Sequence, residues 1–324
     1  MTSTQTRDVP ATLAQITELH SAGCDIVRIG IPDRDSLPAL PDLIRHSPAP
    51  LVADIHFDAS LALKALAYGV AGIRINPGNI GDRKKLLDII SLAKERKSVI
   101  RIGVNAGSLE KQAAKKYRSR VEAMVESALD WLKFFEDQGF FDIKISLKSS
   151  NVIETLDAYR MIDSRCDYPL HLGVTEAGSL LQGTVKSALG IGTLLLEGIG
   201  NTIRVSLTDD PIQEVRVAHL ILSAIGLRHQ GVEIVSCPTC SRTTVDLIGI
   251  VRHVEDSLSS FRPSRKIKVA VMGCEVNGPG EAMDADIGLA FSKEKAFIFQ
   301  KGKMIETLGP NRAVHRFVEL IQKM

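Results

Sequence analysis

Short apolar runs alternate with longer amphipathic stretches over the first two thirds of the chain. Seven of these runs are rich in Ile, Leu and Val and are predicted to be strands, at residues 26–31, 51–57, 72–76, 99–105, 142–147, 170–175 and 202–207. Each is followed by a predicted helix, at 35–47, 59–69, 80–97, 111–138, 150–165, 179–198 and 210–229. Another helix, at 8–22, precedes the first strand. Strands that alternate with helices form parallel β-α units, so the pattern predicts an α/β domain.

Seven strands preceded by a helix are one strand short of an eight-stranded TIM-type (β/α)8 barrel. The missing first strand is expected upstream of residue 1; otherwise the barrel is open on one side. A doubly wound sheet is the competing architecture, but it usually carries a glycine-rich fingerprint after its first strand. No such fingerprint follows residues 26–31. The pattern therefore favours a TIM-type barrel, to which we assign residues 1–230.

The pattern changes near residue 231. A strand at 232–235, a helix at 243–258 and a strand at 266–272 are followed by two or three short strands across 287–308 and a final helix after Pro310. The short strands leave no room for long crossover connections, so their sheet is expected to be antiparallel at least in part. Residues 231–324 are therefore predicted to form a small α+β domain.

Composition narrows the classes of function. Forty basic and 38 acidic residues leave a net charge of +2, which argues against a general attraction to nucleic acid or to a membrane. No apolar run is long enough to span a bilayer, and the first residues lack a signal or transit pattern. Five cysteines, an odd and low number, fit a reducing compartment better than a disulfide framework. The expected location is the cytoplasm.

Cationic or small polar residues alternate with aliphatic residues along the predicted barrel strands. Residues two apart on a strand share a face, so the polar set is expected to face the barrel axis while Ile29, Ile75 and Ile102 face the helices. The polar set is Arg28, Arg74, Asn76, Arg101, Asn105, Lys144, Ser146, Lys148, Arg204 and Ser206. Asp54, His56 and His171 fall in the same register.

The cations of this set need anionic partners, because an unpaired buried cation is strongly unfavourable. Asp54 and Glu176 are the only acids expected nearby, too few for internal salt bridges to satisfy the set. Active sites of TIM-type barrels lie at the carboxyl ends of the strands. Arginine pairs with phosphate oxygens through two N–H groups, and lysine supplies a point charge. A polyanion site is therefore favoured over internal salt bridges, with a diphosphate as the natural ligand.

Three cysteines lie in two segments of the second predicted domain. Cys237 and Cys240 form a C-x-x-C pair, and Cys274 is in a separate segment. Three thiolates can hold an iron–sulfur cluster with one iron open to an oxygen ligand, which gives a Lewis acid that also delivers electrons. An Asn-Gly-Pro-Gly turn directly before Glu281 is suited to bring that carboxylate back toward the cysteines. A structural zinc and a thioredoxin-like dithiol remain open as alternatives.

Distinctive motifs are spread along the whole chain. They are Thr2–Asp8, Asp54-Ile-His56-Phe, Arg74-Ile-Asn76-Pro-Gly-Asn79, Gly103-Val-Asn105-Ala-Gly-Ser-Leu109, Ser146-Leu-Lys148-Ser-Ser150, Gly173-Val-Thr-Glu176-Ala-Gly178, Gly200-Asn-Thr-Ile-Arg204-Val-Ser206-Leu, Cys237-Pro-Thr-Cys240-Ser-Arg242 and Asn277-Gly-Pro-Gly-Glu281. These motifs resemble those of the hydroxymethylbutenyl diphosphate synthases. The resemblance implies a barrel, a small cluster-bearing domain and an iron–sulfur oxidoreductase of the non-mevalonate isoprenoid pathway. Its reaction is the reductive opening of 2-C-methyl-D-erythritol 2,4-cyclodiphosphate to 4-hydroxy-3-methylbut-2-enyl diphosphate.

The same resemblance implies roles for individual residues. A 4Fe-4S cluster would be held by Cys237, Cys240, Cys274 and Glu281. The polar set of the barrel would bind the cyclic diphosphate. Substrate positioning or proton transfer would fall to Asp54, His56 and Glu176, with Glu176 favoured as the proton donor. Implied partners are ferredoxin or flavodoxin as electron donor and a second copy of the chain in a homodimer, in which one subunit's cluster closes over the other's barrel.

Two other classes of function remain as alternatives. One is a non-reductive barrel enzyme for a phosphorylated or pterin-like ligand, with a structural zinc at the cysteines. The other is an electron-transfer module, which would not need inward-facing cations and would be expected to use four thiolates.

Overall fold

The chain forms two compact units, Met1–Ile225 and Gly226–Met324. The computed structural model describes residues 1–80, 83–105, 117–228, 231–258, 261, 263–274, 280 and 284–324. Within these ranges, no helix is both long and apolar enough to cross a membrane.

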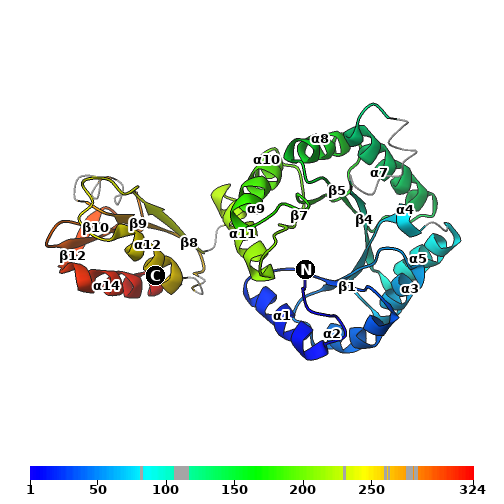
Figure 1. Ribbon diagram of the computed structural model, residues 1–324, viewed down its shortest axis with the longest axis horizontal. Helices are drawn as coiled ribbons and strands as arrows, with labels where there is room; N and C mark the ends of the chain where they lie inside the picture. Colours follow the sequence, from blue (N-terminus) through cyan, green and yellow to red (C-terminus); the bar gives the residue numbers. More distant parts are fainter. Residues whose placement is uncertain are drawn as a thin grey trace. The chain divides into compact units, whose positions relative to one another are not determined.

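The first unit is a ring of parallel strands surrounded by helices (Figure 1). Its strands are β1 Val27–Gly30, β2 Leu51–Asp54, β3 Gly72–Ile75, β4 Val99–Asn105, β5 Ile143–Lys148, β6 His171–Leu172 and β7 Thr202–Ile203. The first five pair in chain order, β6 pairs with β7, and a bridge between Ile145 and Leu170 joins the two sets. All seven predicted strands are present, and the TIM-type architecture is confirmed. β6 and β7 are shorter than the predicted runs at 170–175 and 202–207.

Helices alternate with these strands. They are α1 Val9–Ser21, η1 Arg34–Ala39, α2 Leu40–His46, α3 Ala59–Tyr68, α4 Pro77–Ile80, α5 Arg83–Arg96, α7 Arg120–Asp137, α8 Val152–Asp163, α9 Leu180–Ser187, η3 Ala188–Gly192, α10 Thr193–Leu196 and α11 Pro211–Ala224. The helix predicted over 111–138 begins later, at Arg120, because Ser119 caps it by accepting a hydrogen bond from the N–H of Glu122. Residues 111–116 of that prediction lie outside the described ranges.

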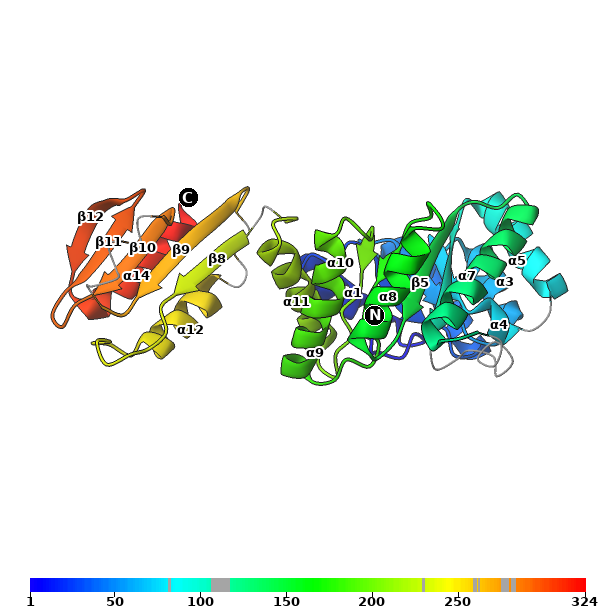
Figure 2. The same ribbon diagram turned by 90° about the horizontal axis from the view of Figure 1, so that it is seen from above.

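In the described part of the chain, the second unit is a five-stranded sheet with two helices. Figure 2 shows its strands side by side: β8 Gly231–Ser236, β9 Lys266–Met272, β10 Ile287–Phe291, β11 Ala296–Gln300 and β12 Lys303–Leu308. β8, β9 and β10 are parallel, and β10, β11 and β12 are antiparallel, which confirms the partly antiparallel sheet. Helices α12 Leu247–Leu258 and α14 Pro310–Gln322 share one core with the sheet, to which Val254, Phe317 and Val269 contribute.

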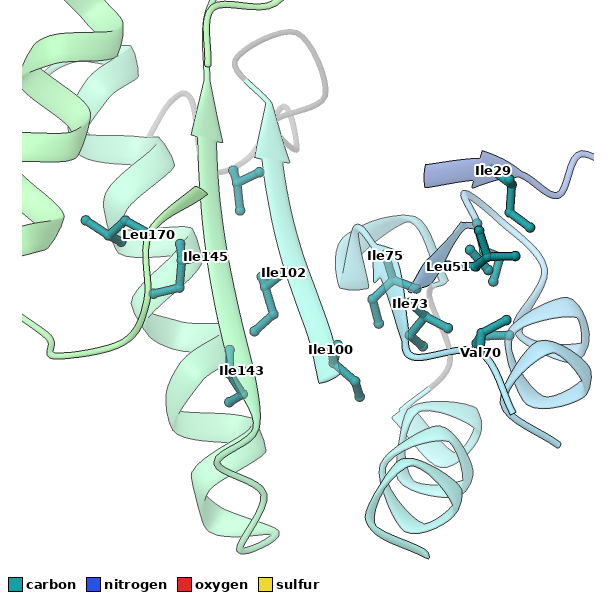
Figure 3. Packing of buried hydrophobic residues seen from close by; sticks show 14 of the residues in the cluster. Ile29, Leu51, Val70, Ile73, Ile75, Ile100, Ile102, Ile143, Ile145 and Leu170 are labelled. Carbon is teal, nitrogen blue, oxygen red and sulfur yellow. The ribbon is translucent and has the colours of Figure 1, made fainter. Parts of the chain in front are cut away.

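The aliphatic residues of the barrel strands form the core of the first unit. Ile29, Ile75, Ile102 and Ile145 are fully buried, and Figure 3 shows them among neighbouring Leu and Val side chains. This is the predicted aliphatic face. Because side chains alternate along a strand, it leaves the other face of each strand to the polar set.

Candidate active site

A row of charged residues crosses four neighbouring barrel strands. Asp54 of β2 is in register with Arg74 of β3, Arg74 with Arg101 of β4, and Arg101 with Lys144 of β5. Neighbouring strands lie about 4.8 Å apart, so three cations stand side by side with one carboxylate at the end of the row. Further cations lie close enough to interact with Arg101. The cation cluster thus comprises Arg28, Arg74, Arg101, Lys144, Lys148 and Arg204.

Asp54 is the carboxylate at the centre of one side of this cluster. It lies 3.4 Å from Nη1 of Arg74, 3.8 Å from Nη1 of Arg28 and 3.6 Å from Nε2 of His56. Burial raises the pKa of Asp54, but the contacts with His56, Arg28 and Arg74 outweigh burial and hold that pKa well below its ordinary value. Asp54 is therefore a carboxylate, not a carboxylic acid, at neutral pH.

A second carboxylate comes from outside the strands. Glu214 of α11 lies 3.6 Å from Nη2 of Arg204 and accepts a hydrogen bond from the N–H of Leu207. The expectation that Asp54 and Glu176 would be the only nearby acids is therefore wrong. Strand periodicity gave no signal for Glu214, because the residue reaches the strand end from a covering helix.

The rest of the cluster lacks counterions in the described part of the chain. Arg101 and Lys148 are 8% and 6% exposed, and neither forms an ion pair there. Among the described residues, the buried Nε atoms of three arginines have no hydrogen-bond partner: Arg28, Arg101 and Arg204. A buried donor without an acceptor is unfavourable, so these groups need an acceptor that the described protein residues do not supply.

The pKa values of the basic groups reflect this excess of positive charge. Burial, then the guanidiniums of Arg28 and Arg74, lower the pKa of Arg101 to about 9. Burial and then Arg101 lower the pKa of the Lys148 ammonium well below its ordinary value. A bound polyanion would reverse both effects, because it favours the charged form of each group.

The remaining predicted polar residues lie around the same ends of the strands. Asn76 and Ser146 are buried; Asn76 accepts a hydrogen bond from the N–H of Gly78, and the Ser146 hydroxyl lies 3.4 Å from the Ile102 carbonyl. Asn105 ends β4 in register with Lys148. Ser206 is half-buried in the segment after β7.

Glu176 lies in the segment after β6. Its side chain is exposed, and its backbone is in the left-handed region with φ of 51°. A non-glycine residue there carries strain of about 1–3 kcal/mol, and such residues are enriched at functional sites. The structure therefore leaves this carboxylate accessible at the strand ends.

His171 is a buried residue of the site that the predicted ligand set did not include, although its register on the strand faces the barrel axis. Its Nδ1 is 2.8 Å from the hydroxyl of Thr202, and its buried Nε2 has no hydrogen-bond partner among the described residues. Burial, then Lys148 and Arg101, lower its pKa well below the ordinary value. His171 is therefore a neutral imidazole at the base of the cation cluster.

Gly103 makes room for Arg74. A Cβ at Gly103 would lie 2.7 Å from Nε and 3.1 Å from Nη2 of that arginine. We therefore expect Gly103→Ala to displace the guanidinium and to weaken binding of inorganic pyrophosphate roughly tenfold, the loss of about 1.4 kcal/mol. Isothermal titration calorimetry measures the dissociation constant of pyrophosphate for the variant and the wild type.

The matched control is Gly192→Ala, whose added methyl would meet only Ile221, at 3.7 Å. Its affinity for pyrophosphate is expected to equal that of the wild type. Equal affinities for all three proteins would show that Arg74 does not contact the anion.

The three cysteines of the second unit lie in segments that contact each other. Cys237 follows β8 and Cys274 follows β9, and these strands are parallel neighbours. The Sγ of Cys237 accepts a hydrogen bond from the N–H of Gly273 at 3.3 Å. The carbonyl of Gly273 accepts one from the N–H of Thr244, so the loop that carries the C-x-x-C pair is attached to the segment that carries Cys274.

These residues fit a metal–sulfur centre by their chemistry. A backbone N–H donated to sulfur stabilises a thiolate, the form in which cysteine binds metal. The backbone N–H of Arg242, and less strongly the hydroxyl of Thr243, lower the pKa of the exposed Cys240 thiol. The fourth predicted ligand, Glu281, is outside the described ranges, and the described residues include no group of three side chains close enough to hold a metal.

Comparisons with known proteins cover both units. Residues 1–219 match the GcpE TIM-barrel domain, and residues 233–323 match the GcpE protein C-terminal domain. A protein of Lawsonia intracellularis is 54% identical over 100% of this chain and 90% of its own length. Proteins of Clostridium perfringens and Geobacter sulfurreducens are each 52% identical, over 99% and 100% of this chain and 92% of their own lengths.

All three relatives carry the same name, 4-hydroxy-3-methylbut-2-en-1-yl diphosphate synthase (flavodoxin). Both family models match in the order expected from the sequence, a barrel followed by a C-terminal domain. The chain therefore belongs to the GcpE family of 4-hydroxy-3-methylbut-2-en-1-yl diphosphate synthases.

Proposed function

We infer that the protein is an oxidoreductase that converts 2-C-methyl-D-erythritol 2,4-cyclodiphosphate to 4-hydroxy-3-methylbut-2-enyl diphosphate, in isoprenoid precursor biosynthesis. The observation that carries this inference is the cation cluster, whose buried charges exceed those of the two carboxylates that pair with it. A cyclic diphosphate supplies the missing negative charge. The reaction consumes two electrons and two protons, opens the ring and releases one water.

Substrate binding follows from the placement of the cations. Arg74 and Arg101 are neighbours on adjacent strands, and Lys148 ends the next strand. Two guanidiniums and an ammonium on one face can each contact a different phosphate oxygen. Four polar side chains are proposed to add hydrogen bonds to the substrate: Asn76, Asn105, Ser146 and Ser206. The remaining cations of the cluster complete its positive surface: Arg28, Lys144 and Arg204. Holding the diphosphate at several points fixes the carbon–oxygen bond that breaks.

Acid–base roles are proposed for the groups around the cluster. Asp54 is ionised and buried, so it orients Arg28, Arg74 and His56 and does not itself donate a proton. The His56 side chain is 50% exposed and lies between Asp54 and solvent, where it can move a proton. Glu176 is accessible at the strand ends and is our proposed proton donor to the departing oxygen.

The electrons are proposed to reach the substrate through a 4Fe-4S cluster held by Cys237, Cys240, Cys274 and Glu281. With three thiolates and one carboxylate as ligands, a bound cluster would have one iron with an exchangeable oxygen ligand, and it would supply both Lewis acidity and electrons. The protein residues keep the sulfur ligands together by attaching the C-x-x-C loop to Gly273.

The partners follow from the same proposal. The relatives' names support flavodoxin as electron donor, and ferredoxin is the second candidate. A homodimer in the cytoplasm completes the proposal, in which the cluster of one subunit serves the barrel of the other.

Binding of the cyclic diphosphate is expected to make the protein take up protons from solution. Because the pKa of Lys148 is lowered in the free protein, part of this amine is neutral in alkaline solution below its ordinary pKa of 10.5. A bound diphosphate favours the ammonium and raises that pKa, so binding takes up protons and weakens as the pH rises. Calorimetry in two buffers of different ionisation enthalpy measures the uptake.

Lys148→Met is the variant that assigns the uptake to this residue. Its measured enthalpy of binding the cyclic diphosphate should depend less on the ionisation enthalpy of the buffer than that of the wild type. A wild-type heat that is independent of the buffer across the alkaline range would contradict the role of Lys148.

An anaerobic assay tests the function itself. Purified protein with bound iron and sulfide is mixed with reduced flavodoxin and the cyclic diphosphate. The proposal predicts the linear hydroxy-diphosphate, with two electrons consumed for each molecule formed. Flavodoxin oxidation without product, or product without electron consumption, would contradict it.

A further inference from the structure

Tyr159 of α8 places its hydroxyl between two strands of the barrel. The hydroxyl accepts a hydrogen bond from the backbone N–H of Leu147, 3.1 Å away, and donates one to the backbone carbonyl of His171 at 2.5 Å. The tyrosine side chain is fully buried. Burial raises the pKa of the phenol, so the hydroxyl stays protonated and can act as donor and acceptor together.

This hydroxyl takes the place of one direct backbone hydrogen bond, here called a rung, in the ladder between β5 and β6. In a parallel ladder the N–H groups of every second residue on one strand bond to every second carbonyl on the next. The N–H of Ile145 donates to the Pro169 carbonyl at 2.9 Å. The next rung in this register would join the N–H of Leu147 directly to the carbonyl of His171, and the Tyr159 hydroxyl lies between those two groups.

The interruption is local. Beyond it, the N–H of Thr175 donates to the Ser149 carbonyl at 3.1 Å, which continues the same register. On the other side of β5, residues 143–148 pair without a break with residues 100–105 of β4. β5 is thus continuous with β4, and its register with β6 is the same before and after the rung that Tyr159 occupies.

Two inward-facing groups of the site flank this rung. Lys148 follows Leu147 directly, and a Cβ at Gly173 would lie 3.1 Å from its Nζ, so the ammonium lies against the β6 segment. His171 is 8% exposed with Nε2 buried and unpartnered. The spacing of β5 and β6 at this rung therefore sets where the Lys148 ammonium lies relative to the rest of the cation cluster.

We propose that Tyr159 is a positioning residue for the diphosphate site, because its hydroxyl holds β5 and β6 apart so that the Lys148 ammonium faces the bound anion. This rests on the proposed function, since it takes the cyclic diphosphate as the ligand. Tyr159 itself does not touch the ligand. It acts through Lys148. A positioning role therefore requires Lys148 for its effect on binding, whereas a general loss of barrel stability does not.

A double-mutant cycle between Tyr159→Phe and Lys148→Met tests the role. Calorimetry measures the dissociation constant of the cyclic diphosphate for the cluster-containing protein and for the three variants. We expect Tyr159→Phe to weaken binding about tenfold in the wild-type background and to have no further effect when Lys148 is already methionine. Tyr168→Phe is the control: it removes the hydroxyl that donates an exposed hydrogen bond to Glu136, and it should bind as the wild type does.

The outcomes distinguish a failure of the positioning role from a failure of the proposed function. If Tyr159→Phe weakens binding equally in both backgrounds, or not at all, the positioning role is wrong while the proposed function stands. If the wild type does not bind the cyclic diphosphate, the proposed function itself fails, and this inference fails with it.

A second variant covers the case in which Tyr159→Phe does not fold. Replacement of Tyr159 by p-aminophenylalanine keeps the ring volume and the N–H donor to the His171 carbonyl but offers Leu147 a poor acceptor. It should weaken binding about threefold, and again only when Lys148 is present. An equal effect in the Lys148→Met background would overturn the role.

Discussion

Replacement of Arg101 by methionine is expected to weaken diphosphate binding strongly and, at the same time, to make the barrel more stable. Arg101 stands between two other cations on neighbouring strands, is 8% exposed and has no ion-pair partner in the described part of the chain. Losing a buried contact to a phosphate should weaken binding of the cyclic diphosphate roughly 100-fold or more, a loss of about 3 kcal/mol.

The gain in stability has the same cause as the loss of binding. A buried charge without a counterion opposes folding, and methionine fills a similar volume without that charge. Removing the charge should therefore raise the free energy of unfolding by about 1–3 kcal/mol and the melting temperature by a few degrees. Calorimetric titration and thermal unfolding of the ligand-free protein measure the two effects.

Arg160→Met is the control for Arg101→Met. Arg160 is an exposed arginine paired with Glu197 on the outside of the barrel. Its replacement should leave binding unchanged, and the stability should change little, because surface ion pairs contribute little. An Arg101→Met protein that is less stable than the wild type and still binds the diphosphate would show that an internal partner neutralises this charge.

Replacement of Cys237, Cys240 or Cys274 by serine is expected to remove the proposed iron–sulfur cluster. Each change takes away one of three thiolates, and a hydroxyl is a poor ligand for cluster iron. Protein purified without oxygen should lose most of its bound iron and sulfide and its broad visible absorption. Turnover of the cyclic diphosphate should fall below detection, because the chain then has no route for the electrons.

The other two cysteines are built-in controls. Cys24 and Cys166 are half-buried in the barrel unit, and both pack against its core. Burial raises the pKa of both thiols, which disfavours the thiolate that metal binding requires. Serine at either position should leave the iron content unchanged. A full iron content in Cys274→Ser, or its loss in Cys166→Ser, would contradict the proposed ligand set.

Strand periodicity was enough to predict the barrel and the strand face that carries the cation cluster. Period-two alternation separates Ile75 and Ile102, which are buried in the core, from Arg74 and Arg101, which share the opposite face. Because neighbouring strands in a parallel sheet are in register, a cation at the same position of consecutive strands predicts a row of cations. The structure shows that row.

Contacts made from helices were not predictable in this way. Glu214 reaches Arg204 from α11, and Tyr159 reaches the backbone of β5 and β6 from α8. Apolar spacing assigns each helix a buried face, but it does not say which polar group on that face meets a strand end. Such a group depends on tertiary packing, which a single sequence does not report.

Helix starts depended on local side-chain bonds that periodicity does not resolve. The helix predicted at 243–258 begins at Leu247, because Asp246 caps it by accepting a hydrogen bond from the N–H of Gly249. Before this cap, the N–H of Thr244 donates to the Gly273 carbonyl and attaches the C-x-x-C loop to the segment of Cys274. This tertiary contact, which periodicity does not report, brings two cysteine segments together.

A structure of the protein with the cyclic diphosphate bound is the most direct test of the central claim, that the cation cluster of the barrel is the substrate site. We expect phosphate oxygens within hydrogen-bonding distance of Arg74, Arg101 and Lys148, and the buried Nε of Arg101 to gain an acceptor. A diphosphate bound elsewhere, with the Nε of Arg101 still unpartnered, would contradict the account.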